Sequence, residues 1–243
     1  MGNDQAGVKS EFVHTVFADI ADRYDVMNSV LSFNQHKLWR RFAMRKMQLR
    51  EGDHCLDVAT GTGDWAIAMA KTVGRGGEVL GLDFCQEMLD VAEPKLQKLG
   101  IDGFTSLLHG NAMAMPFPDD TYDVATIGFA LRNVPDVLQV IKEMTRVVKP
   151  GSMVVSLELS KPDFKPFRTL YYFYFYRILP VIGRMAVGKD APYRWLPESL
   201  RTFPDRHQLA RLFVEAGLER VVSYPLTFGI CALHIGYKPV RSA

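Results

Sequence analysis

The chain has 243 residues, of which 48% are hydrophobic and 23% are charged, the composition of an ordinary globular protein rather than of a disordered or fibrous chain. Its formal net charge of +2 gives no overall signature of nucleic-acid binding. No stretch approaches the run of about 18 apolar residues that predicts a membrane-spanning helix, so we do not expect an integral membrane protein.

The first predicted element is a helical cap that covers residues 1–50. Between His36 and Arg50 this segment carries six Lys or Arg residues and no acid. Three of them, Lys37, Arg41 and Arg45, are spaced by four residues and therefore fall on one helical face. Such a basic face suits anionic lipid head groups, and it equally suits plain solvation.

Residues 51–160 alternate short β-rich runs with amphipathic segments. We predict a series of strands and intervening helices: strands at 54–60, 77–83, 105–110, 122–130 and 151–160, and helices at 64–73, 85–100 and 135–148. Repeated strand–helix units favour an α/β fold with a mostly parallel, doubly wound sheet and helices on both faces. Ligands of such sheets bind at the carboxyl ends of the strands, so a site is expected there.

The alternation breaks in residues 161–206, which hold six prolines and an uninterrupted aromatic run from Tyr171 to Tyr176. Helical spacing divides the side chains of this segment between two faces, with Phe167, Tyr171, Tyr174 and Ile178 on one and Tyr172, Phe175 and Leu179 on the other. One face can pack on the core while the other meets substrate or lipid; the alternative is a fully buried helix.

The last part of the chain, 207–243, returns to the pattern of the core. We predict a helix near 207–216 and strands at 219–226 and 230–237. With these the sheet would have seven strands, and 1–243 would form one domain in which 161–206 is a helical insertion.

A glycine-rich turn follows the first core strand, in the run LDVATGTGDW. Gly61 and Gly63, with Thr62 between them, let a ligand approach the backbone closely. Asp83 stands at the end of the next strand, where a carboxylate can accept hydrogen bonds from a ribose diol. This combination predicts a nucleoside-containing cofactor, either NAD or S-adenosyl-L-methionine (SAM).

Three features favour SAM. Ala66 replaces the third glycine that a dinucleotide pyrophosphate needs, and Asp57 precedes the turn, where its carboxylate can meet the amino group of a methionine moiety and would repel a phosphate. Asn111 and Ala112 follow another strand and can contact the edge and face of an adenine. Taken singly, each of Asp57, Asp83 and Asn111 could equally be a turn or helix-cap residue.

The motifs resemble those of the UbiE/COQ5/MenG family of quinone-biosynthesis C-methyltransferases, over nearly the whole chain. Residues 24–39, YDVMNSVLSFNQHKLW, match one family signature at every specified position, and residues 146–160, RVVKPGSMVVSLELS, match the second except that Ser152 replaces a glycine. The resemblance implies a class I SAM-dependent methyltransferase (Rossmann-like) fold. It also implies methyl transfer to a ring carbon of a polyprenylated hydroquinone, with demethylmenaquinol favoured over the benzoquinol of ubiquinone synthesis.

The implied chemistry needs a group that stabilises a phenolate or accepts its proton, because a phenol has a pKa near 10. Arg132 and Asn133, just after the fourth core strand, are the candidates for binding the ring oxygens and stabilising the charge. His36, Tyr24 and Asp25 of the cap are rival candidates for the base or for orienting groups. No metal ligand set is predicted.

The expected partners are the polyprenyl quinol and a membrane surface, with a homodimer also considered and no nucleic acid. Three widely separated cysteines and an amino-terminal stretch without an apolar signal core favour a cytoplasmic protein that associates peripherally with the membrane. Two other classes of function stay open at this point: an NAD-dependent oxidoreductase, and a catalytically silent SAM-binding subunit.

Overall fold

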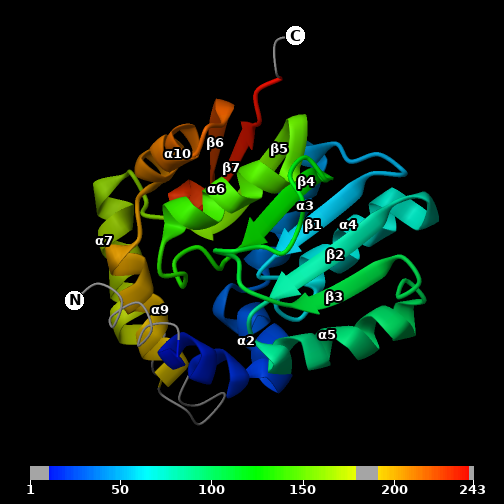
Figure 1. Ribbon diagram of the computed structural model, residues 1–243. Helices are drawn as coiled ribbons and strands as arrows, with labels where there is room; N and C mark the ends of the chain where they lie inside the picture. The colour runs from blue at the N-terminus through cyan, green and yellow to red at the C-terminus, as the bar shows by residue number, and fades with distance from the viewer. Residues whose placement is uncertain (1–10, 179–190, 241–243) are drawn as a thin grey trace.

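In the computed structural model, which describes residues 11–178 and 191–240, seven strands form one sheet (Figure 1). Their order is β3-β2-β1-β4-β5-β7-β6. The strands are β1 (His54–Val58), β2 (Glu78–Asp83), β3 (Thr105–His109), β4 (Tyr122–Gly128), β5 (Val148–Leu159), β6 (Glu219–Leu226) and β7 (Cys231–Tyr237). Strands β1 to β5 pair in parallel, and β7 is antiparallel to both β5 and β6. The predicted mostly parallel sheet is confirmed.

Helices cover both faces of the sheet, because successive side chains of each strand point to opposite sides. Cys55 packs in one core with residues of α3 (Gln35–Met47), α4 (Asp64–Val73) and α5 (Gln86–Leu99). Its neighbour Leu56 packs in a second core with residues of α6 (Val137–Val147) and α10 (Arg206–Glu215). The chain reverses its direction across the sheet between β1 and β4, so their carboxyl ends mark the switch point.

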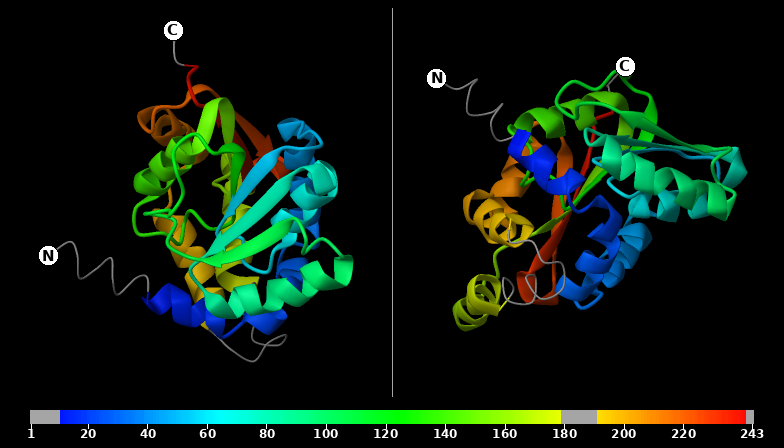
Figure 2. Two further views of the ribbon diagram at one scale, coloured as in Figure 1. Left: turned by 45° about the vertical axis from the view of Figure 1, so that its right-hand side comes forward. Right: turned by 90° about the horizontal axis from the view of Figure 1, so that it is seen from below.

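The cap and the inserted segment gather at the carboxyl edge of the strands (Figures 1 and 2). The described cap consists of a helical stretch at 11–18, η1 (Ala21–Arg23), α2 (Tyr24–Leu31) and α3. The described inserted elements are α7 (Lys165–Phe173), the π-helical turn η3 (Tyr174–Ile178) and α9 (Ala191–Thr202). Two short 3₁₀ turns, η2 (Gly74–Gly76) and η4 (Thr227–Gly229), connect other elements.

Three strand boundaries differ from the prediction by two residues or more. Strand β4 ends at Gly128 rather than at residue 130, and Phe129 after it has a φ of 56°. Strand β1 ends at Val58 rather than at residue 60, because Ala59 has a φ of 54° and begins the glycine turn. Strand β5 begins at Val148 rather than at 151, because Val148 already pairs with Tyr122 before an irregularity in the ladder. Helix α4 has the bounds that were predicted.

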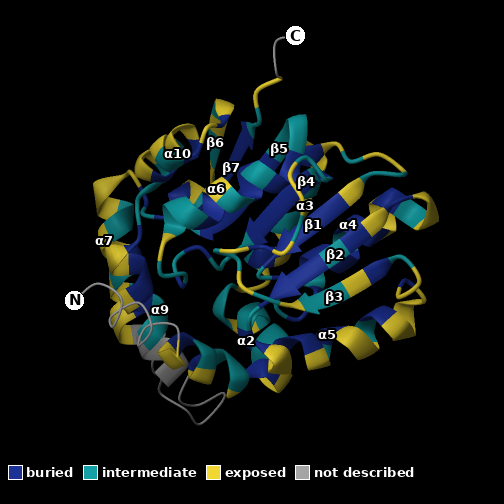
Figure 3. Ribbon diagram, viewed as in Figure 1, coloured by how far each residue is buried: buried dark blue, intermediate teal, exposed yellow. Residues whose placement is uncertain are grey.

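The aromatic segment is neither a fully buried helix nor divided as predicted. Tyr171 and Phe175 are both buried and their ring centroids lie 4.4 Å apart, so Phe175 shares the face of Tyr171 instead of the opposite face. Residues four apart are neighbours on a helix, and the turn becomes π-helical at Tyr174. Leu170 and Phe173 are largely exposed, as the yellow parts of α7 in Figure 3 indicate. Leu179 lies outside the described residues.

Candidate active site

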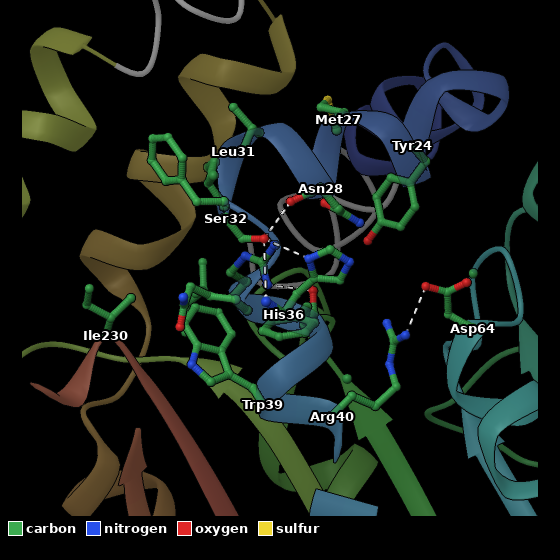
Figure 4. A pocket seen from close by; sticks show the side chains of 18 of the residues that line it. Tyr24, Met27, Asn28, Leu31, Ser32, His36, Trp39, Arg40, Asp64 and Ile230 are labelled. Atoms are coloured by element: carbon green, nitrogen blue, oxygen red, sulfur yellow. Dashed lines mark hydrogen bonds and ion pairs between the residues drawn. The ribbon is translucent and has the colours of Figure 1, made fainter. Parts of the chain in front are cut away.

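Two adjoining cavities lie at the carboxyl edge of the sheet. The larger, about 640 Å³, is enclosed by the cap, the glycine turn, the end of β4 and the inserted segment, and apolar side chains form most of its wall (Figure 4). The smaller, about 310 Å³, lies over the ends of β2 and β3. Tyr24, Gly61, Gly128 and Phe129 line both cavities, so the two form one continuous site.

The glycine turn exposes backbone to both cavities. Gly61 and Gly63 have φ values of 56° and 79°, which a residue with a Cβ adopts only with strain. An added Cβ at Gly61 would have no protein atom within 4 Å, so the turn leaves room for a ligand there. At Gly128 an added Cβ would lie 2.9 Å from the Trp65 ring. The Trp65 ring therefore occupies the space that a side chain at position 128 would need.

Asp57 is buried beneath the turn and braces it. Its carboxylate accepts hydrogen bonds from Thr126 Oγ1 at 2.7 Å, Thr60 Oγ1 at 2.8 Å and the Ala66 backbone N–H at 3.1 Å. Burial raises the pKa of Asp57 to about 6, and the hydrogen bonds act against that rise. The side chain lines the larger cavity, so a buried acid with a raised pKa lies where a cation was expected.

Asp83, Asn111 and Ala112 lie together around the smaller cavity, as the strand ends predicted. Asp83 is 5% exposed and accepts hydrogen bonds from the backbone N–H groups of Gly61 at 2.7 Å and Cys85 at 3.0 Å. It therefore links the end of β2 to the glycine turn. The side-chain oxygen of Asn111 accepts from Met113 N at 2.9 Å in a local turn, which leaves its amide hydrogens for a ligand.

Asp25 and Thr62 fasten the cap to the glycine turn. Thr62 Oγ1 donates to Asp25 at 2.6 Å, and Lys95 of α5 reaches the other carboxylate oxygen of Asp25 at 2.8 Å. Asp25 lines neither of the two cavities. The geometry thus favours a structural role for Asp25, which connects the cap to the glycine turn. Its predicted role as a base has no support from its position.

His36 and Tyr24 do reach the larger cavity from the cap. His36 is 7% exposed, and its Nδ1 lies 2.7 Å from Ser32 Oγ (Figure 4). Burial and the nearby Arg40 charge lower the pKa of His36, which keeps the ring neutral at pH 7. Burial raises the pKa of Tyr24, so its phenol stays protonated. Of these two, only His36 is in the protonation state of a base.

Arg132 is held by a carboxylate that sequence reasoning missed. Glu158, near the end of β5, is 1% exposed and accepts from Arg132 Nη1 at 2.6 Å, and Arg132 also donates to the Phe129 carbonyl. Glu158 is the glutamate of the second signature, so its motif position was the available signal. The Arg132 side chain is 9% exposed and lines the larger cavity, which places a fixed positive charge in its wall.

Two buried polar atoms near this ion pair have no hydrogen-bond partner among the described residues: Arg132 Nε and the Tyr171 hydroxyl. Both residues line the larger cavity, and the charges of Arg132 and Glu158 act on the Tyr171 hydroxyl. Buried polar groups are normally paired. Both atoms are thus buried donors, in residues of the cavity wall, that the described protein leaves unused.

Asn133 is brought to the smaller cavity rather than the larger one. Its Oδ1 accepts a hydrogen bond from Trp195 Nε1 of α9 at 2.9 Å, and Trp195 packs edge-on against Phe12 of the amino-terminal helical stretch. The amide of Asn133 keeps its two hydrogens for a ligand, and the same residue ties the inserted segment to the loop after β4.

A model of the ubiE/COQ5 methyltransferase family matches residues 5–238 of the chain. The curated demethylmenaquinone methyltransferase of Bacillus cytotoxicus is 52% identical over 231 residues, which cover 95% of this chain and 97% of the relative. The protein of the same name from Geobacillus kaustophilus is 53% identical over 230 residues, which cover 95% of this chain and 98% of the relative.

Solved structures of SAM-dependent methyltransferases share the fold. One from Aquifex aeolicus has a TM-score of 0.60 at 22% identity and covers 81% of this chain and 88% of its own. One from Thermotoga maritima has a TM-score of 0.64 at 15% identity, with 93% and 99% covered. The sheet and its flanking helices are thus those of a class I methyltransferase.

Proposed function

Because the chain belongs to the ubiE/COQ5 methyltransferase family, we propose that it methylates a ring carbon of a polyprenylated demethylmenaquinol, with SAM as the methyl donor. The chain is a SAM-dependent C-methyltransferase by family, so NAD-dependent oxidation is set aside. The observation that supports the quinol is the large apolar cavity, which carries the buried Arg132–Glu158 pair and opens beside the glycine turn.

The residues of the two cavities fit SAM. The smaller cavity offers Asp83 for a ribose diol and Asn111 with Ala112 for an adenine, between apolar walls that include Met88 and Met113. The open side of Gly61 and the acid of Asp57 suit the methionine part. When bound, SAM supplies an electrophilic methyl group on its sulfonium. Gly61, Thr62, Gly63 and the acids would hold it, in a site that excludes water.

The larger cavity fits the aromatic head group of the quinol. Its apolar wall replaces water around a ring, and that wall includes Arg132 and Tyr171, each with a buried donor that has no partner among the described residues. A donor that carries a full charge stabilises a developing phenolate more strongly than water does in such a dry site. Arg132 thus acts on the charge, and Tyr171 supplies a neutral donor in the wall of the same cavity.

Turnover by the purified protein tests the proposed function. With SAM and a short-chain demethylmenaquinol under reducing conditions, we expect the corresponding menaquinol and S-adenosylhomocysteine in equal amounts. The corresponding benzoquinol is the competing substrate, and kcat/KM for the two head groups decides between them. SAM binding without any transfer would instead support the silent SAM-binding subunit.

We expect Asp57 to couple SAM binding to the release of a proton. Burial raises the pKa of Asp57 to about 6, so part of its carboxyl population is protonated at pH 6, and the amino group of the methionine part favours the ionised form. SAM binding at pH 6 should therefore release a proton from Asp57, whereas binding at pH 8 should not. Calorimetry in two buffers of different ionisation enthalpy measures this release.

The matched variants are Asp57→Asn, which should lose the buffer dependence at pH 6, and Asp123→Asn as a control. Asp123 lies outside both cavities, and its partners lower its pKa, so it is already ionised at pH 6. Binding enthalpies of the wild type that are equal in the two buffers at pH 6 would rule out the contact between Asp57 and the amino group.

The rim of the larger cavity supports a membrane surface as the partner that delivers the quinol. Phe33, Leu170 and Phe173 line this cavity and are 70%, 62% and 56% exposed. Lys37 and Arg41 of α3 are also exposed, so the cap adds positive charge. No helix in the described ranges, 11–178 and 191–240, combines the length and apolar character needed to cross a bilayer. We therefore propose peripheral association with the cytoplasmic face; the homodimer stays a prediction.

Co-sedimentation with vesicles tests this surface. The wild type should bind vesicles with anionic lipid and lose part of that binding as salt rises. Replacing Leu170 and Phe173 together by serine should weaken binding at least about tenfold, because two apolar side chains no longer enter the lipid. Val214→Ser on α10 is the control, since Val214 is 60% exposed but lines neither cavity. Equal binding by all three proteins would contradict the assigned surface.

A further inference from the structure

The hydroxyl of Ser32 has three hydrogen-bond neighbours. The His36 backbone N–H donates to it at 3.4 Å, and the two closer neighbours determine where the other hydrogens lie. Ser32 Oγ is 2.6 Å from the Asn28 carbonyl oxygen and 2.7 Å from His36 Nδ1. A carbonyl has no hydrogen to give, so the single hydroxyl hydrogen of Ser32 occupies the bond to Asn28. The hydrogen of the second bond must then come from His36, whose Nδ1–H donates to Ser32.

This arrangement leaves the other ring nitrogen of His36 bare. A neutral imidazole carries one hydrogen, so Nε2 is an acceptor when Nδ1 is protonated. Figure 4 shows one ring nitrogen directed at Ser32 and the other directed away from it, on the side where the Tyr24 side chain projects. Among the described residues Nε2 has no hydrogen-bond partner, and His36 lines the larger cavity.

We propose that His36 Nε2 accepts the proton of the quinol hydroxyl next to the reacting carbon, and that Ser32 is the positioning residue that keeps Nε2 bare. This inference rests on the proposed function. In the step the O–H bond breaks and an Nε2–H bond forms, while the electron pair stays on the oxygen. The imidazolium keeps its Nδ1–H bond to Ser32, and the phenolate charge activates the ring carbon.

The proton transfer is uphill without help, because a phenol holds its proton more tightly than a histidine does. Arg132 lines the same cavity with a fixed charge and can offset part of that cost on the oxygen. The charged groups that act on His36 itself are Lys37 and Arg40 of its own helix, Asp25 of α2 and Asp64 of α4. Arg40 forms an ion pair with Asp64 at 2.9 Å, and the two charges have opposite effects on the pKa of His36.

Nitrogen NMR of the histidine rings in the ligand-free protein tests the tautomer directly. Above the pKa of His36, the wild type and Ser32→Thr should show Nδ1 protonated and Nε2 bare, whereas Ser32→Ala should shift population to the other tautomer. Ser29→Ala is the control, because Ser29 lies on α2, three residues before Ser32, and lines neither cavity. An Nε2–H signal from His36 in the wild type would overturn the proposal.

Kinetics test the proton acceptor. His36→Asn keeps an amide N–H for Ser32 but removes Nε2, so its thermal stability should stay near that of the wild type while kcat falls about 10²–10⁴-fold. Ser32→Ala should lower kcat about tenfold, and Ser32→Thr should restore it. Normal kcat in a folded His36→Asn protein would overturn the role of Nε2. Absence of any methyl transfer by the wild type would instead overturn the proposed function and this role together.

Discussion

Arg132→Ala should lower kcat by about 10²–10³ and also lower the free energy of unfolding by about 3–5 kcal/mol. The first effect follows from the loss of the charge that stabilises the phenolate. The second follows from Glu158, which is 1% exposed and pairs with Arg132 at 2.6 Å. Without the guanidinium a buried carboxylate is left without its cation. Rapid-quench turnover and urea denaturation measure the two effects separately.

The loss of stability should depend on pH in a defined direction. Burial raises the pKa of Glu158 and the Arg132 charge acts against that rise, so removal of Arg132 raises this pKa further. The folded variant then binds a proton that the unfolded chain releases at neutral pH. Its stability relative to the wild type should therefore improve as the pH falls from 8 towards 5. A deficit that does not change with pH would contradict the buried pair as its cause.

A double variant separates the two roles of Arg132. Replacing the pair by apolar side chains, in Arg132→Met with Glu158→Leu, should recover much of the stability because no charge stays buried. It should not recover kcat, since the phenolate still has no cation. Arg132→Lys should recover part of kcat, because an ammonium keeps the charge but loses the planar geometry. Full activity in the double variant would show that Arg132 only supports the fold.

The sheet could be predicted because its signals are local. The apolar strands and the intervening helical periodicity each lie within about ten residues, and the glycine turn marks the strand that ends at the site. The resemblance also selected Arg132 and His36, and both line the larger cavity. What it did not supply was the partner of each group, which decides its protonation state and freedom to move.

Those partners are set by packing between elements that are distant in the chain. Glu158 is 26 residues from Arg132, and Trp195 is 62 residues from Asn133. Asp25 belongs to the same signature as His36, yet it pairs with Thr62, 37 residues away, and does not line the larger cavity. The spacing of residues along the sequence encodes none of these pairings. A signature can therefore identify the residues near a site without showing which of them contact the substrate and which only hold the structure together.

Asp83→Ala should weaken SAM binding by about 1–3 kcal/mol, the cost of leaving hydrogen-bonding groups unpaired. The structure adds a second cost. Asp83 accepts the backbone N–H groups of Gly61 and Cys85 before any ligand is present, and the alanine variant leaves both without an acceptor. The ligand-free variant should therefore melt at a lower temperature, and saturating SAM should raise that temperature less than in the wild type.

Calorimetry and thermal melting with and without SAM measure both costs, and Asp90→Ala is the matched control. Asp90 lies on α5, is exposed and pairs only locally, with Gln86 at 2.8 Å. Its removal should leave SAM affinity unchanged. If Asp83→Ala lost stability but kept the SAM affinity of the wild type, Asp83 would serve only to hold the glycine turn, and the ribose would have to be bound by another group of the smaller cavity.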